Sequence, residues 1–474
     1  MTRRRTGAAE AKSRTPAGAG QPSLPLPNRE LLERLGQIAL RLGTRSFLVG
    51  GPVRDLLLRT GEARWQKRDV RSQKSSDPVG LPDIDVAVEE GSREFGAAVA
   101  KEFGRSFVYH GRFLTGTVSF PGPQATNLEL QAPGAELSLL ASRLSPLAHI
   151  DITQTRAETY ERPAALPAVR PASIVGDLGR RDFTINAMAF EITPGSFGEF
   201  IDPFDGRVDL AQRCVRVLHA RSFIDDPTRI FRCIRFATRL DFSIERQTLD
   251  LMRSAIEQRL PAFLTPERIL YELRLICAEP LVLPMVKALI REGVLEAAWR
   301  WTPPSGFVSA FAKLAAKLGT RSESSTDSVM SRAELFFIYW LSSLPVTDRF
   351  PIRKEERNAA EAIAAFGTLR TKLKPGLKPS AVYQVLRGVP EPALSILAAL
   401  DTKAVSASIR AFLDSHGKVR IVTTGVDLRG AGLKPGPAFR EILDELLFAR
   451  LDGKIRSVTE ERTLLQQLIR QQVG

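Results

Sequence analysis

Apolar positions follow two different patterns along the chain. In the first part, short apolar runs bounded by glycine, proline or charged residues are typical of strands. These runs are Phe47–Val49, Ile84–Val88, Thr117–Phe120, His149–Thr153 and Ala187–Ile192. From Asp225 onward, apolar residues recur at helical spacing almost throughout. The pattern predicts an α+β chain in which a mixed sheet comes first and helices follow it.

The length of the chain predicts more than one domain, because 474 residues exceed what one hydrophobic core holds. Residues 1–28, rich in Arg, Ala, Gly and Pro, lack apolar periodicity and are expected to form a flexible basic arm. We expect the sheet domain, or head, at residues 29–205 and a helical neck at residues 206–300. Residues 301–474 then form a helical body and tail. A cluster of Pro, Gly and Ser predicts a linker or long loop at Thr302–Asp327.

Charge and cysteine content indicate the kind of partner and compartment. The formal net charge of +14 predicts affinity for polyanions. The 3 cysteines have no metal-ligand spacing, which favours a reducing compartment without disulfides. No apolar run approaches the ~18–20 residues that cross a bilayer. We therefore expect a cytoplasmic protein that makes no use of a membrane.

Two aspartates in the second predicted strand are the most informative feature. Strand alternation places Asp83 and Asp85 on one face, and Ile84 and Val86 on the other. Two neighbouring carboxylates repel each other, and a divalent cation between them relieves this. The pair therefore indicates a metal site. Taken alone, an edge strand with solvated aspartates fits the same pattern.

A glycine pair links the first predicted strand to a helix. Gly50 and Gly51 follow Phe47–Val49 and precede a helical stretch that contains Arg54 and Asp55. A strand, a Gly-Gly turn and a helix start bring bare backbone N–H groups and the positive end of a helix dipole to one point, where a phosphate group binds well. An ordinary tight turn is the alternative for such a pair.

Further motifs follow in a fixed order. They are Arg180-Arg181-Asp182-Phe-Thr-Ile-Asn186-Ala-Met188, Ile201-Asp202-Pro-Phe-Asp-Gly206 and Asp225-Asp226-Pro-Thr-Arg229-Ile-Phe-Arg232-Cys-Ile-Arg235-Phe236. With these motifs the sequence resembles the class II tRNA nucleotidyltransferase and poly(A) polymerase family, whose members add CCA or parts of it to tRNA 3′ ends. A stretch at Gly425–Pro437 is similar to the tail segment of the family.

The resemblance implies a nucleotidyltransferase head and a two-metal reaction. Asp83 and Asp85 would hold two Mg²⁺ ions, while the 3′-hydroxyl of an RNA attacks the α-phosphate of ATP or CTP and pyrophosphate leaves. Asp151 lies on a strand of the same alternation and is a candidate third carboxylate. It could equally cap the chain or pair with Arg156. Gly50, Gly51 and Arg54 would bind the triphosphate, with a structural pair between Arg54 and Asp55 as the alternative.

The motif at Arg180–Met188 resembles the segment with which the family recognises the ribose. A 2′-hydroxyl both donates and accepts hydrogen bonds, so Arg180, Arg181 and Asp182 could distinguish it from a deoxyribose. An exposed cluster of salt bridges is the alternative for these three residues taken alone. Asn186 is expected to support the segment beside the nucleotide.

The motif at Asp225–Phe236 resembles the one with which the family selects the base. Asp226 before a proline fits a helix N-cap. An aspartate accepts from an exocyclic amine, and Arg229 donates to a ring nitrogen, so cytosine and adenine fit while guanine and uracil do not. On the same helix Arg232 and Arg235 continue a basic side that would line the groove for the RNA end. A capped helix with a surface arginine is the alternative.

Three features depart from the family pattern. Thr60–Gly80 and Pro121–Ala148 are longer than the corresponding family segments and fit surface insertions, which loops tolerate. Asp225 stands where the family usually has Glu, which leaves the partner of that position open.

The expected partner is tRNA or another RNA 3′ end, and several functions share this pattern. Full CCA addition, CC addition, A addition and poly(A) synthesis would use the same residues, although the tail segment favours tRNA. A non-catalytic RNA-binding protein would not need the aspartates and the base-selecting motif together. Nucleotide transfer to a small molecule would not need the basic excess. The sequence does not determine the oligomeric state.

Overall fold

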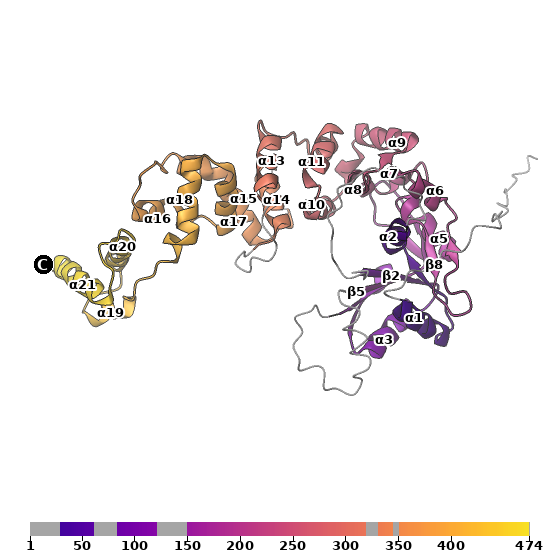
Figure 1. Cartoon of the computed structure of the whole chain (residues 1–474), viewed down its shortest axis with the longest axis horizontal. Helices are drawn as coiled ribbons and strands as arrows, with labels where there is room; N and C mark the ends of the chain where they lie inside the picture. Colours follow the sequence, from indigo (N-terminus) through magenta and orange to yellow (C-terminus); the bar gives the residue numbers. More distant parts are fainter. Residues whose placement is uncertain (1–28, 61–82, 121–148, 319–329, 345–349, 474) are drawn as a thin grey trace, which may run out of the picture. The chain divides into compact units, whose positions relative to one another are not determined.

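A computed structural model describes residues 29–60, 83–120, 149–318, 330–344 and 350–473 of the chain (Figure 1). The expected arm at residues 1–28 lies outside these ranges. So do residues 61–80 of the first expected insertion and residues 121–148 of the second, and those expectations stay predictions.

The chain packs as two compact units. The first runs to Asp226 and includes Leu240–Leu251, and the second consists of Pro227–Arg239 and the chain from Met252 on. In the first unit, residues 206–226 pack with the head although the sequence groups them with the helical neck. The expected domain boundaries at residues 205 and 300 stay a prediction, because the chain packs as two units and not as three.

A seven-stranded mixed sheet forms the centre of the first unit, with the strand order β3-β4-β5-β2-β1-β8-β9. Its strands are β1 Ser46–Val49, β2 Asp83–Val88, β3 Ser106–His110, β4 Thr115–Ser119, β5 His149–Gln154, β8 Ala189–Glu191 and β9 Phe200–Ile201. Strand β2 runs parallel to β5 and antiparallel to β1, and β4 runs antiparallel to β5. The predicted α+β class with a mixed sheet is confirmed, and so are all five predicted strands, to within two residues at each end.

Short helices and two smaller strand pairs complete the first unit. The helices are α1 Arg29–Arg41, α2 Gly51–Thr60, α3 Ser92–Phe103, α5 Ile174–Gly179, α6 Gly206–Ala211 and α7 Ser222–Asp225. The strand pairs are β6 Arg156–Thr159 with β7 Ala168–Pro171, and β10 Cys214–Val215 with β11 Ser243–Ile244. Helix α5 packs on the sheet through Ile174 and Leu178, which contact Phe47 and Val49 of β1 in one apolar cluster. This contact fixes where the chain after α5 lies.

The second unit is helical. Its helices, with α9 beginning in the first unit, are α8 Thr228–Leu240, α9 Arg246–Glu257, α10 Pro266–Ala278, α11 Val282–Arg291, α12 Val294–Trp299, α13 Phe307–Leu318, α14 Arg332–Leu341, α15 Lys354–Arg370, α16 Pro379–Leu386, α17 Glu391–Leu400, α18 Lys403–Asp414, α19 Gly425–Gly430, α20 Pro437–Leu451 and α21 Val458–Val473. None of the helices in the described ranges is long and apolar enough to span a membrane.

The expected linker at Thr302–Asp327 is wrong for its middle part, because α13 occupies Phe307–Leu318. Phe307, Phe311 and Leu314 recur at helical spacing, and all three are buried. Phe311 meets the ring of Trp340 on α14 edge-on, with centroids 6.0 Å apart. Packing against other aromatic rings therefore decides the conformation of a segment whose flanks are rich in loop-forming residues.

A buried carboxylate joins three helices of the second unit. Glu356 on α15 is fully buried and accepts hydrogen bonds from Arg274 on α10 at 2.6 Å and from Arg353 at 2.8 Å. The Arg274 guanidinium also lies 3.9 Å from the centre of the Phe337 ring on α14. Burial opposes ionisation of Glu356, but the two arginines outweigh it and lower its pKa to about 2.

Replacing Glu356 by glutamine should destabilise the second unit by about 3 kcal/mol, because Arg274 and Arg353 would lose a buried counter-charge. Urea unfolding followed by tryptophan fluorescence measures this, since three of the four tryptophans, Trp299, Trp301 and Trp340, lie in the second unit. Glu355→Gln, at the exposed neighbouring position, is the control and should leave the midpoint unchanged.

The same contact predicts a dependence on pH. The folded pKa of Glu356 lies below the ordinary glutamate value of about 4.3. Its stabilisation is therefore complete above about pH 4.3 and is lost as the pH falls towards 2. The Glu356→Gln variant should lack this part of the acid dependence, and an unchanged acid profile would contradict the assignment.

Candidate functional site

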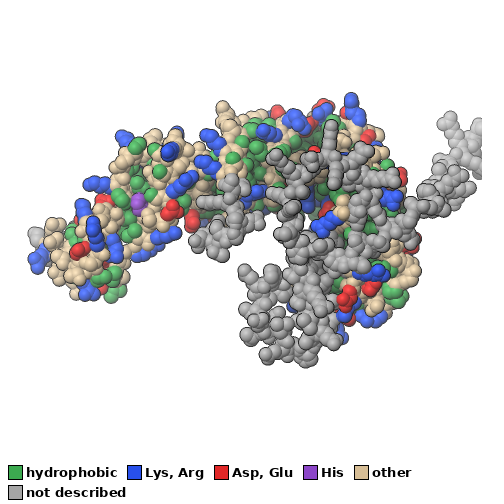
Figure 2. Space-filling model, viewed as in Figure 1, with side chains coloured by type: hydrophobic (Ala, Val, Ile, Leu, Met, Phe, Trp, Pro, Cys, Tyr) green, Lys and Arg blue, Asp and Glu red, His purple; other side chains and the backbone are tan. Residues whose placement is uncertain are grey.

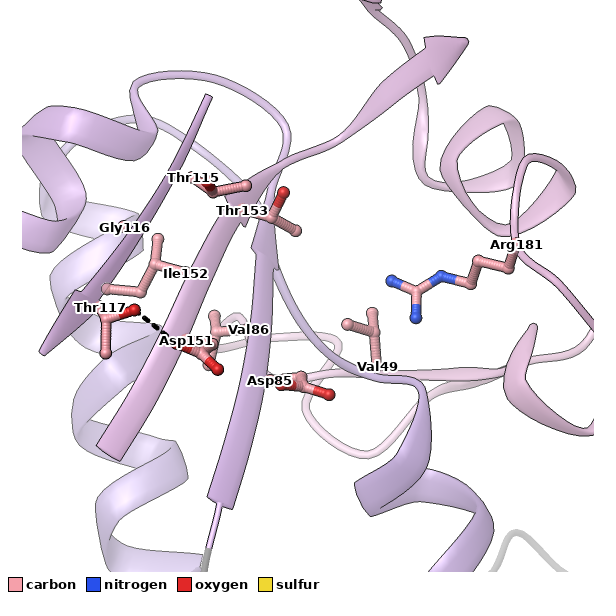
Figure 3. Close-up of a pocket in the computed structure, with 10 residues that line it drawn as sticks. All are labelled: Val49, Asp85, Val86, Thr115, Gly116, Thr117, Asp151, Ile152, Thr153 and Arg181. Carbon is pink, nitrogen blue, oxygen red and sulfur yellow. Dashed lines mark hydrogen bonds between the residues drawn. The ribbon is translucent and has the colours of Figure 1, made fainter. Parts of the chain in front are cut away.

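A cavity of about 310 Å³ lies beside the sheet of the first unit (Figure 3). It is lined by Val49, Asp85, Val86, Thr115, Gly116, Thr117, Asp151, Ile152, Thr153 and Arg181. Strands β1, β2, β4 and β5 supply all of these residues except Arg181, which follows α5. Figure 3 shows the Arg181 guanidinium pointing into the cavity from the side opposite Asp151. Two carboxylates and one cation thus line the same cavity.

The two carboxylates come from adjacent positions of neighbouring strands. Asp85 of β2 and Asp151 of β5 are Cα partners in the parallel register. The residues before them, Ile84 and Ile150, are fully buried, so both strands turn an aspartate to the cavity and an isoleucine to the core. Asp83 is the first residue of β2, and its side chain lies outside the description.

Asp151 lies in the cavity and does not pair with Arg156. The Thr117 hydroxyl donates to Asp151 Oδ1 at 2.6 Å, and His149 Nε2 lies 3.4 Å from Asp151 Oδ2. Arg156 instead pairs with Glu158 at 3.1 Å and donates to the carbonyl of Phe113. The carboxylate proposed from the sequence therefore reaches the cavity, and Thr117 fixes its orientation.

The backbone at Gly50 lies close to a cation, Arg181, and to a carboxylate, Asp85. Gly50 has φ +74°, in the left-handed region, and its carbonyl accepts from the Arg54 N–H at 3.1 Å as α2 begins. A Cβ at this position would lie 2.7 Å from Arg181 Nη1 and 3.5 Å from Asp85 Oδ2. Only a glycine satisfies both the backbone conformation and this approach. Gly51 then starts α2, so the first N–H groups of this helix lie next to Gly50.

Arg54 is part of a buried chain of polar contacts. It is 3% exposed, pairs with Asp55 at 2.7 Å and donates from Nη1 to Asn186 Oδ1 at 2.6 Å. The Asn186 amide in turn donates to Asp182 Oδ1 at 3.0 Å. The Arg54–Asp55 pair expected as the alternative is thus present, and Asn186 supports Asp182 within its own motif. The contacts tie α2 to the segment that carries Asp182.

The two adjacent arginines occupy different places. Both bind the carboxylate of Asp177 on α5, Arg180 at 2.8 Å and Arg181 at 3.0 Å. Among the residues that line the cavity, only Arg181 comes from this pair. Burial opposes ionisation of Asp177, but Arg181 and Arg180 outweigh it and hold its pKa below the usual value.

The residues expected to select the base belong to separate units. Asp226 is the last residue of the first unit before the chain enters the second, and α8 begins at Thr228, one residue after Pro227. Arg229 is 5% exposed within the second unit. Their arrangement around a base therefore stays a prediction.

Two further arginines of α8 contact their own unit. The guanidiniums of Arg232 and Arg235 lie over the Phe236 ring, 5.5 and 5.0 Å from its centre. Arg235 is 7% exposed and lies 3.4 Å from a carboxylate oxygen of Glu279 and 3.8 Å from one of Glu272. Arg235 thus has a packing role whether or not it also faces RNA.

The chemistry of the cavity suits a hard divalent cation. Asp85 and Asp151 offer carboxylate oxygens, the ligands that Mg²⁺ prefers, from two strands held in register. The described side chains, to which that of Asp83 does not belong, contain no group of three or more potential metal ligands. The donor set therefore fits Mg²⁺.

Two residues of the site, Asp177 and Thr117, are not predicted by the sequence patterns above. Asp177 lies three and four residues before the two arginines, a spacing that brings helical side chains together and could have revealed it. The contact of Thr117 with Asp151 depends on the pairing of β4 with β5, which no local pattern specifies.

Comparisons with known proteins show which family this chain is similar to. Residues 46–216 match the family model described as the poly(A) polymerase head domain. The A-adding tRNA nucleotidyltransferase of Halalkalibacterium halodurans is 30% identical over 87% of this chain and 86% of its own length. The enzyme of the same name from Geobacter sulfurreducens is 31% identical over 94% of this chain, which spans 47% of that relative.

Solved structures of the same kind share the fold. A CCA-adding enzyme in an apo form aligns with a TM-score of 0.69 and 26% identity, over 94% of this chain and 95% of the other. The Thermotoga maritima CCA-adding enzyme complexed with tRNA aligns with a TM-score of 0.64 and 25% identity, over 93% and 95% of the two chains.

Gly50→Ala should destabilise the first unit and displace Arg181. Gly43 also has a left-handed φ, but a Cβ there meets nothing within 4 Å, so Gly43→Ala measures the backbone cost alone, about 1–2 kcal/mol. Gly50→Ala adds the contact with Arg181 and should cost roughly 1–3 kcal/mol more. Urea unfolding followed by circular dichroism compares the two variants, and equal costs would show that Arg181 does not restrict this position.

Proposed function

This chain belongs to the tRNA nucleotidyltransferase family, and we propose that it adds nucleotides from ATP and CTP to tRNA 3′ ends, without a template and with Mg²⁺. It is a nucleotidyltransferase by its family. The observation that carries the proposal is the cavity in which Asp85 and Asp151 face Arg181 beside the bare backbone of Gly50. Acidic groups for a metal and basic groups for a triphosphate are what phosphoryl-type transfer requires.

In the proposed reaction the RNA 3′-oxygen forms a bond to the α-phosphorus, and the bond from that phosphorus to the pyrophosphate oxygen breaks. Asp83 and Asp85 would hold Mg²⁺, with Asp151 beside them. When bound, Mg²⁺ activates the attacking hydroxyl and neutralises the triphosphate. The N–H groups at Gly50 and Gly51 would donate to phosphate oxygens.

The ribose and the base would be read by separate groups. Arg181, which lines the cavity, is proposed to contact the ribose together with Arg180 and Asp182 of the same motif. Asp226 and Arg229 would pair with the amine and ring nitrogen that cytosine and adenine share. A mismatched guanine or uracil would leave both groups unpaired, at about 1–3 kcal/mol each. Arg232 and Arg235 are proposed to support the RNA end.

A transfer assay with three RNAs tests the function: a tRNA transcript that lacks CCA, one that lacks only the terminal A, and an unrelated RNA. The relatives named A-adding, one of them covered over 86% of its length, favour transfer of AMP to the transcript that already ends in CC. If the transcript that lacks CCA is extended in the presence of CTP, the protein also transfers CMP. Long A tails on the unrelated RNA would indicate a poly(A) polymerase instead.

Asp85→Ala and Asp83→Ala should each lower kcat at least about a thousandfold, because the carboxylates would act mainly in the transition state. Affinity for tRNA, measured by filter binding, should stay within about twofold, since phosphate contacts elsewhere supply most of it. Asp250→Ala removes an exposed carboxylate of the first unit and serves as the control. Substantial activity in either cavity variant would contradict the proposed metal site.

A second cavity supports tRNA binding by the helical unit. It has a volume of about 390 Å³ and is lined by Lys313, Arg370, Leu400, Asp401 and Thr402, from or next to α13, α15, α17 and α18. Arg370 and Asp401 pair at 2.9 Å, which leaves the charge of Lys313 in excess. Helix α18 begins directly after Thr402, so its first N–H groups lie at the same place. We propose that a tRNA phosphate binds here.

Lys313→Ala should weaken tRNA binding and reduce the slope of log K against log salt by about one, because one phosphate contact is lost. The KM for ATP should not change. Lys354→Ala is the matched control, since this exposed lysine lies at the opposite end of α15 from Arg370. The same reduction in slope for both variants would show a general charge effect rather than a site.

A further inference from the structure

One buried carboxylate holds both guanidiniums that follow α5. Asp177 is fully buried. Its Oδ1 accepts from Arg180 Nε at 2.9 Å, and its Oδ2 accepts from Arg181 Nη2 at 3.0 Å and from Arg181 Nε at 3.3 Å. Each arginine thus has an oxygen of its own. Asp177 lies in the last turn of α5, and the chain after the helix keeps the two arginines at the i+3 and i+4 spacing that brings side chains together.

Arg180 is fixed from a second side as well. Its Nη1 donates to Glu158 of β6 at 2.8 Å, and the same carboxylate accepts from the Tyr160 hydroxyl at 2.8 Å. Arg156 also pairs with Glu158. Arg180 therefore connects α5 with the β6–β7 hairpin, and this connection holds the carboxylate of Asp177 in place.

Arg181 divides its nitrogens between two neighbours. Nε and Nη2 face Asp177, whereas Nη1 is the atom that lies 2.7 Å from the Cβ position of Gly50. Asp85 Oδ2 lies 3.5 Å from the same position. Figure 3 shows the guanidinium directed into the cavity towards Asp85. Arg181 is held by Asp177, and its Nη1 thus faces a ligand that binds between Gly50 and Asp85.

We infer that Asp177 is a positioning residue for nucleotide transfer: it holds Arg181 so that Nη1 faces the nucleotide and does not pair with Asp85. The inference rests on the proposed function, because it assigns the nucleotide as the ligand of this nitrogen. A long arginine side chain has many rotamers, and without Asp177 the nearest carboxylate of the cavity is that of Asp85. Arg181 would then neutralise an acidic group that the reaction needs.

A double-mutant cycle in the full chain tests the inference. Asp177→Asn alone should lower kcat/KM for ATP by up to about a hundredfold. KM should rise because a guanidinium moved by an ångström no longer meets the nucleotide, and kcat should fall because Arg181 then pairs with Asp85. In the Arg181→Ala background the same change should lower kcat/KM by less than about threefold. If the loss of kcat/KM in the double variant equals the product of the losses in the two single variants, the inference is overturned. A normal kcat/KM for Asp177→Asn would overturn it too.

A matched variant at another buried ion pair distinguishes a general loss of stability from a loss of positioning. Glu191 is also buried in the first unit and pairs with an arginine, Arg45, at 2.5 Å, but neither residue lines the cavity. Glu191→Gln should lower the unfolding temperature and leave kcat/KM for ATP within about twofold. A loss of kcat/KM equal to that of Asp177→Asn would mean that any buried ion pair of this unit has the same effect, and the inference would fail.

Arg181→Lys gives a second route if Asp177→Asn does not fold. A lysine has a single nitrogen where the guanidinium has three spread over a plane, so it cannot occupy both the positions of Nε and Nη2 beside Asp177 and the position of Nη1 beside Gly50. This variant should lose nearly as much kcat/KM as Arg181→Ala, and wild-type activity would overturn the inference. No transfer by the wild-type chain on any tRNA transcript would contradict the proposed function instead. An active wild type without coupling between positions 177 and 181 would contradict only the positioning role.

Discussion

The close approach of charged side chains to the backbone of Gly50 is the constraint on which the site depends. A guanidinium from one side and a carboxylate from the other come within a few ångströms of the place where a Cβ would be. Opposite charges this near would form a direct ion pair unless other contacts held each side chain in place. The register of β2 with β5 fixes the carboxylate, and a buried aspartate fixes the guanidinium.

Buried ion pairs recur as the means of fixing parts of this protein. In the first unit, Asp177 joins a short helix to the segment that lines the cavity, and Arg54 joins α2 to the same segment through Asn186. In the second unit, Glu356 joins α15 to α10. Such pairs add little net stability compared with apolar packing, but they allow few alternative arrangements. Rigid placement is useful where a reaction depends on sub-ångström geometry.

Several site residues could be found from the sequence because the required pattern is local. Asp83 and Asp85 share a strand face by alternation, and Gly50 marks a turn between a strand and a helix. Asp177 was within reach of the same reasoning, since its spacing from the arginines is helical. The middle of Thr302–Asp327 was misjudged, because loop-forming residues at its flanks concealed the apolar spacing of α13.

The sequence by itself determined the order of strands and helices, the face on which the aspartates lie and the resemblance to the family, because each depends on neighbours along the chain. Only the tertiary structure decided that Asp151 stands beside Asp85, that Thr117 orients it, and that Arg181 rather than Arg180 enters the cavity. These facts depend on strand register and on contacts between residues far apart in the chain. Packing of the whole sheet selects such contacts, and no local pattern records them.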